Sequence, residues 1–95
     1  MNNNLLPLGT VVLLKNATKK LFIAGYGVND NETKKLFDYI GYSYPEGFID
    51  PKLNFVFNKE DIDKVVYEGY KDKEFDAVDK NITKYINDKR NNKNE

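Results

Sequence analysis

The first 70 residues contain short apolar runs separated by residues that favour turns. Runs of this length, bounded by Gly, Pro, Asn and Asp, predict β-strands rather than helices. Gly25 and Gly41 lie inside two of the runs and predict a bulge or a bend in each. The sequence Pro45-Glu46-Gly47 is typical of a turn. The five predicted strands are 10–15, 20–26, 35–44, 54–57 and 64–70.

The hydrophobic period changes after residue 72. Apolar residues then recur at spacings of three and four, which places them in one stripe along a helix; they are Phe75, Val78, Ile82, Tyr85 and Ile86. Acidic residues come early in this segment and basic residues come late, which suits the helix dipole. The pattern predicts a C-terminal amphipathic helix over 73–89.

These elements predict an α+β fold: a small curved antiparallel sheet of about five strands, in the form of an SH3-like partly open barrel, plus the C-terminal helix. A twisted meander with the helix across one face is the alternative. A helical turn is expected at Asn58–Asp61, where the Asn58 side chain can cap the exposed amides. Residues 5–89 form one predicted domain, and the polar ends, 1–4 and 90–95, are predicted to be disordered.

Composition restricts the function. Fifteen basic and fifteen acidic side chains give a formal net charge of zero, and Arg90 is the only arginine. Proteins that bind nucleic acid usually have a basic excess and favour arginine, so we expect no nucleic-acid partner. The absence of cysteine removes disulfides and favours the cytoplasm. The apolar start, Leu5–Leu14, contains Pro7 and Gly9 and is interpreted as a strand, not as a membrane span or signal peptide.

The chain has few side chains that could act in enzyme catalysis. The chain has no histidine and no cysteine, so imidazole bases and thiolate nucleophiles are excluded. Glu60, Asp61 and Asp63 cluster, and paired carboxylates can run hydrolysis or hold a hard metal ion. The simpler interpretation is that they begin the predicted helical turn. We therefore predict no enzyme activity, no catalytic residue, no metal and no cofactor.

The aromatic residues are the strongest candidates for function. Alternation along the third strand places Phe37 and Tyr39 on one face and Ile40, Tyr42 and Tyr44 on the other, and Tyr26 and Tyr70 are expected to add to this outer set. In the fifth strand, Val65 and Tyr67 are expected to share one face. Tyrosine is enriched in protein interfaces. The candidate interface residues are Tyr42, Tyr44, Glu46, Phe48 and Tyr70.

An alternative uses the lysine pairs Lys19-Lys20 and Lys34-Lys35. Together with Tyr26 and Tyr42 as stacking platforms, they could bind nucleic acid on a small barrel. The simpler interpretation is that both pairs are solvated and discourage strand pairing at the sheet edge.

Three blocks of sequence occur in an order that is similar to a known family. They are "LLPLGTVVLLKNATKKLFIAGY" (5–26), "FDYIGYSYPEGFID" (37–50) and "FNKEDIDKVVYEGY" (57–70). Over about residues 5–78 the chain resembles the domain of unknown function 4176 family, small proteins of Gram-positive bacteria encoded in type VII secretion gene clusters near toxins with an LXG export domain.

The resemblance implies a cytoplasmic accessory, an adaptor or chaperone-like partner of a secretion toxin or a machinery component. An immunity protein is the rival role within the same setting. The family provides no catalytic residues to transfer to this chain. Glu46, at the tip of the Pro-Glu-Gly turn, matches the family pattern and is harder to explain by core packing than the glycines and prolines around it. The oligomeric state stays open.

Overall fold

The computed structural model describes residues 5–92 and confirms five strands and a C-terminal helix. The elements are β1 (Val11–Leu14), β2 (Leu21–Asn29), β3 (Leu36–Ser43), β4 (Phe55–Phe57), the 3₁₀ turn η1 (Lys59–Asp61), β5 (Ile62–Tyr67) and α1 (Lys73–Asn92). Residues 90–92 are the last residues of α1. The disorder predicted for 1–4 and for 93–95 lies outside the described residues.

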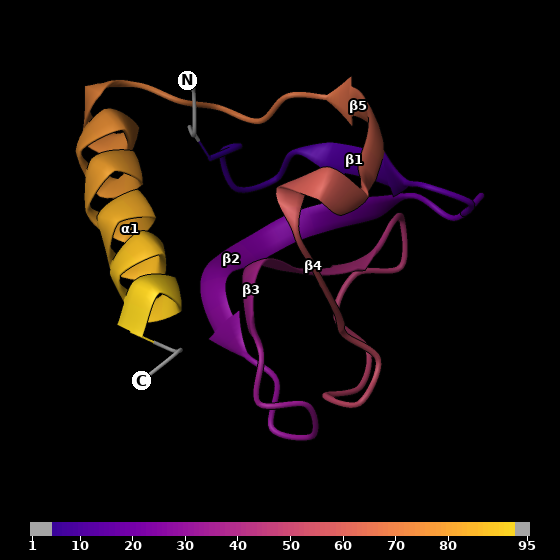
Figure 1. The fold of residues 1–95 in the computed structure, drawn as a ribbon. Helices are drawn as coiled ribbons and strands as arrows, with labels where there is room; N and C mark the ends of the chain where they lie inside the picture. The colour runs from indigo at the N-terminus through magenta and orange to yellow at the C-terminus, as the bar shows by residue number, and fades with distance from the viewer. Residues whose placement is uncertain (1–4, 93–95) are drawn as a thin grey trace.

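The strands form one antiparallel sheet in the order β4-β3-β2-β1-β5. The sheet is curved and unclosed, with β4 and β5 as its edges, and β2 bends strongly through its centre (Figure 1). The predicted bulge in β2 is confirmed by a register shift between Ile23 and Gly25. Gly41 lets β3 approach β2, because a Cβ atom at this position would lie 2.5 Å from the Phe22 carbonyl oxygen.

The core lies on the concave side of this sheet. Its fully buried centre is Tyr39, whose ring centroid lies 5.5 Å from that of Phe57 and 5.9 Å from that of Tyr26. The other buried apolar residues of this cluster are Leu5, Val12, Leu21 and Ile23. The expectation that Tyr26 joins the outer set is wrong, because the bulge in β2 turns its side chain towards the core.

The N-terminal segment is fixed by tyrosine hydroxyls. Leu6 N–H donates to the Tyr39 hydroxyl (3.1 Å), and the Tyr26 hydroxyl donates to the Leu6 carbonyl oxygen (2.6 Å). Both polar groups of the Leu6 backbone are therefore satisfied beside the core, which keeps them from incurring a desolvation cost.

The same tyrosines predict an alkaline limit to stability. Burial raises the pKa of the Tyr39 hydroxyl to about 12, although the hydrogen bond from Leu6 opposes the shift, and burial raises the pKa of Tyr26 as well. An unfolded tyrosine ionises near pH 10, below the raised pKa of the folded state. As the pH rises, the hydroxyl therefore ionises first in the unfolded state, which lowers the free energy of unfolding. Tyr39 should therefore contribute a loss of about 2 kcal/mol between pH 10 and pH 12.

Urea denaturation of the wild type and of Tyr39→Phe at pH 9, 10, 11 and 12 measures this loss. The variant lacks the ionising hydroxyl at position 39, so its unfolding free energy should fall less steeply over this interval. Equal pH slopes for the two proteins would contradict the assignment.

Helix α1 packs on the core side of its own sheet, beside the bend of β2 and next to β3 (Figure 1). Phe75 and Ile82 contact the core cluster, and Ile86 is buried. Leu5 N–H donates to Asp79 Oδ1 (3.0 Å), which joins the N-terminal segment to the helix. The helix leaves the convex face of the sheet uncovered. Among residues 5–92, no helix is both long enough and apolar enough to cross a membrane.

Asn58 is the N-cap residue of η1 and forms a capping box with Asp61, and its side chain also contacts other elements. Its Oδ1 atom accepts from the Asp38 N–H (2.9 Å) and from Arg90 Nη2 (2.9 Å). At η1, Asp61 Oδ2 accepts from the Asn58 N–H (2.9 Å). Asn58 thus joins η1 to β3 and to the end of α1.

Candidate functional site

A row of apolar side chains crosses the convex face of the sheet. The strand register pairs Tyr67 with Val11, Val11 with Phe22, and Phe22 with Tyr42, so one line crosses β5, β1, β2 and β3. Residues that pair directly across neighbouring strands point to the same face. The row lies on the face opposite the core because the adjacent residue Val12 is fully buried.

Two further aromatic residues extend this row. The Phe48 ring meets the Tyr42 ring edge-on, with centroids 5.3 Å apart, and Tyr42 in turn lies 6.1 Å from Phe22. Tyr44 is joined to the start of β2 by its N–H, which donates to the Lys20 carbonyl oxygen (2.9 Å). We call the set of Val11, Phe22, Tyr42, Tyr44, Phe48 and Tyr67 the outer aromatic face.

The predicted placement of Tyr42 and Tyr44 opposite Tyr39 is therefore confirmed. In β5, however, Val65 pairs with Val12 and Tyr67 pairs with Val11, across a register shift. The two residues lie on opposite faces, which corrects the expectation that they share one. For this reason Tyr67 is not among the candidate interface residues named from the sequence. The sequence feature that could have identified it is its position as an aromatic residue within the fifth predicted strand.

A groove of about 530 Å³ lies on the outer aromatic face. Its walls come from the turn before β1, from β1 itself, and from the ends of β2, β3 and β5. The lining residues are Gly9, Val11, Lys20, Tyr44, Val66 and Tyr67. Tyr44 is 46% exposed and Tyr67 is 65% exposed. The groove is therefore an accessible apolar hollow with one cationic side chain.

The other two predicted interface residues differ in their positions. Glu46 forms an exposed ion pair with Lys19 (2.8 Å), and the hydrogen bond from Lys19 lowers the pKa of the Glu46 carboxyl. Tyr70 lies beyond β5 in the segment that leads to α1, and its hydroxyl donates to Asp72 Oδ2 (3.0 Å). This hydrogen bond raises the pKa of Tyr70. Glu46 thus borders the outer aromatic face, whereas Tyr70 belongs to the connection before the helix.

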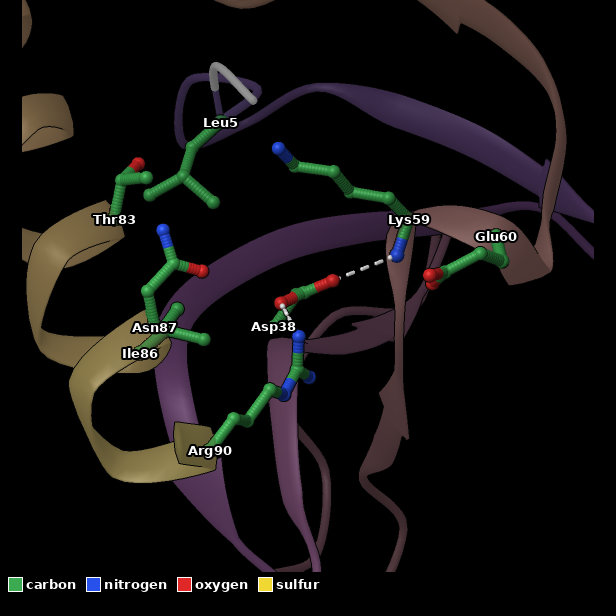
Figure 2. Close-up of a pocket in the computed structure, with 8 residues that line it drawn as sticks. All are labelled: Leu5, Asp38, Lys59, Glu60, Thr83, Ile86, Asn87 and Arg90. Carbon is green, nitrogen blue, oxygen red and sulfur yellow. Dashed lines mark hydrogen bonds and ion pairs between the residues drawn. The ribbon is translucent and has the colours of Figure 1, made fainter. Parts of the chain in front are cut away.

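A polar cluster surrounds Asp38 where α1, β3 and η1 meet (Figure 2). The buried Asp38 carboxylate accepts from the Lys59 N–H (2.9 Å) and pairs with Arg90 Nη1 (3.2 Å). Arg90 Nη2 also donates to the Leu36 carbonyl oxygen (3.0 Å). Burial lowers the pKa of the Lys59 side chain. The cluster borders a cavity of about 100 Å³ between α1 and the sheet. Its hydrogen bonds and ion pair have a structural role, because they hold the end of α1 against β3 and η1.

The acidic residues named from the sequence do not converge on a metal site. Asp61 is engaged at the start of η1, as described above. Within residues 5–92 no group of three or more acidic side chains lies close enough to hold a metal ion.

The fold and the site together define a small α+β domain with a curved sheet, a helix on the core side of the sheet and an aromatic outer face. The chain belongs to the family described as a domain of unknown function (DUF4176), whose family model matches residues 5–78. No curated protein and no solved structure matches the chain.

Several glycines in the sequence blocks that resemble the family are explained by the backbone conformation or by close packing. Gly9 and Gly47 adopt positive φ angles of 86° and 77°, which favour glycine. A Cβ atom on Gly69 would collide with the Leu8 carbonyl oxygen. These glycines are therefore required by the backbone, while Tyr44 and Glu46 stand on the surface.

Proposed function

We propose that this protein is a non-enzymatic protein–protein interaction module that binds its partner through the outer aromatic face. The observation that carries the proposal is the row of paired aromatic and apolar side chains on the side of the sheet that α1 leaves uncovered. Three members of the face are exposed, Tyr44, Phe48 and Tyr67, and the other three are half-buried. Exposed apolar side chains grouped on one face are typical of interaction sites. Tyrosine and phenylalanine are enriched in protein interfaces because they combine large apolar area with few rotatable bonds.

The chemistry of the chain supports a binding role. It has no histidine or cysteine, and the carboxylate of Asp38 is engaged by two donors that hold the fold together. We further propose that such a module acts in the cytoplasm, as an accessory, an adaptor or a chaperone-like partner of a type VII secretion toxin or of a secretion component, and the family resemblance supports this proposal. This setting is part of the proposal.

The double variant Tyr44→Ala/Tyr67→Ala tests the face directly. Both side chains are substantially exposed, so the fold should survive their removal. We expect partner binding to weaken at least tenfold, which corresponds to about 1.4 kcal/mol or more. Tagged protein would be recovered from its native lysate with a moderate salt wash, and mass spectrometry would compare what each variant retains.

Tyr85→Ala is the matched control, because Tyr85 is 44% exposed but lies on α1. It should retain the partner at the wild-type level. Equal retention by the double variant and the wild type would overturn the proposal. Recovery of nucleic acid alone would favour the nucleic-acid-binding alternative. If a toxin is captured, a growth-rescue assay would separate an adaptor from an immunity protein.

A further inference from the structure

The groove on the outer aromatic face is lined by apolar side chains and by one cationic side chain. Val11, Val66 and the rings of Tyr44 and Tyr67 supply apolar walls, whereas Lys20 supplies a cation at the edge. Within residues 5–92, no acidic residue lines the groove. An apolar side chain of suitable size could therefore be enclosed next to a positive charge.

The charge on Lys20 is not neutralised locally. Among residues 5–92, no ion pair involves Lys20. Two carboxylates on the flanking turns are already engaged with other lysines: Glu46 with Lys19 (2.8 Å) and Glu68 with Lys71 (3.2 Å). The border of the groove is thus complementary to an anion.

We infer that the groove receives a partner segment in which an aromatic or large aliphatic side chain lies next to a carboxylate. The apolar side chain would enter between Tyr44 and Tyr67, and the carboxylate would lie against the Lys20 ammonium group. Charge complementarity of this kind selects among partners more than it adds affinity. The inference rests on the proposed function and specifies the chemistry of the partner.

A pair of small probes tests the inference without knowledge of the partner. 3-Phenylpropionate has an aromatic ring and a carboxylate, and 3-phenylpropionamide is its nearly isosteric neutral counterpart. Each would be titrated into ¹⁵N-labelled protein at low ionic strength while amide chemical shifts are followed. Ligands of this size bind with dissociation constants of about millimolar at best. We expect the carboxylate to shift the amides of Gly9, Val11 and Tyr67, and to bind about three- to tenfold more tightly than the amide.

Charge variants test whether Lys20 causes the difference in affinity between the two probes. Lys20→Gln should reduce the affinity for 3-phenylpropionate to that for the amide probe. Lys52→Gln makes the same charge change in the loop before β4, away from the groove, and should leave both affinities unchanged. Added salt should reduce the preference for the carboxylate, because exposed ion pairs are screened.

Three results would overturn the inference. They are the absence of shifts at the groove, equal affinity for the two probes, and amide shifts that change on dilution without any probe, which would identify a second copy of the chain as the occupant. Equal affinity at the groove would remove the requirement for a carboxylate while leaving the apolar face as an interface. The proposed function is tested separately by the Tyr44→Ala/Tyr67→Ala comparison, which leaves Lys20 unchanged.

Discussion

Replacement of Tyr39 by alanine should destabilise the protein by about 3–5 kcal/mol, because the substitution leaves a large cavity in a small core. The Tyr39 side chain is fully buried between Phe57 and Tyr26. Its hydroxyl also accepts the hydrogen bond from Leu6 N–H, so the variant leaves that amide without its partner. Domains of this size are stable by about 5–15 kcal/mol, and the loss is therefore a large fraction of the total.

Urea denaturation followed by circular dichroism would measure the effect. Tyr39→Phe separates the two contributions, since it keeps the ring and removes only the hydroxyl; it should cost about 1 kcal/mol. Tyr44→Ala removes a tyrosine from the opposite face, where it is half exposed, and should cost less than about 1 kcal/mol. Similar losses for Tyr39→Ala and Tyr44→Ala would show that the core does not depend on Tyr39.

The hydrophobic pattern was sufficient to predict the fold. Turn residues bounded the five strands, and the three-and-four spacing of Phe75, Ile82 and Ile86 predicted the helix that contacts the core. Both signals are local, because each depends on residues within one element. The alternation along β3 likewise placed Tyr39 and Tyr42 on opposite faces.

The faces of β2 and β5 were harder to predict because bulges change the alternation. Ile23 is buried, and simple alternation would turn Tyr26 outwards, but the extra residue at the bulge brings it to the core. The register shift in β5 separates Val65 from Tyr67 in the same way. Gly25 indicated the bulge in β2, yet its consequence for Tyr26 depends on the pairing with β3.

The candidate site could be predicted only in part. Tyr42, Tyr44 and Phe48 could be named from one continuous stretch of sequence. The groove also needs Lys20 and Tyr67, and their meeting depends on which strands are neighbours in the sheet. Arg90 is a similar case, since its hydrogen bond to the Leu36 carbonyl oxygen joins residues 54 positions apart.

The contact of Arg90 with Asp38 leads to a second large effect. Asp38→Ala should destabilise the protein by about 2–3 kcal/mol. The substitution removes the acceptor of the Lys59 N–H and the ion-pair partner of the Arg90 guanidinium, which keeps its hydrogen bonds to Asn58 and Leu36. Loss of one member of a fully buried ion pair costs about 3–5 kcal/mol, but the Arg90 side chain is 37% exposed, so water compensates part of the loss.

A structural signature should accompany this loss. Since Arg90 joins the last turns of α1 to β3, amide hydrogen exchange in residues 84–90 should accelerate more in Asp38→Ala than exchange in β2. Asp88→Ala is the matched control: Asp88 lies on the same helix and pairs with Lys84 (3.0 Å), but both side chains are more than half exposed. Such a pair contributes about 0.3–0.5 kcal/mol. Equal destabilisation by the two variants, or unchanged exchange at the end of α1, would show that the Asp38–Arg90 contact does not hold the helix against the sheet.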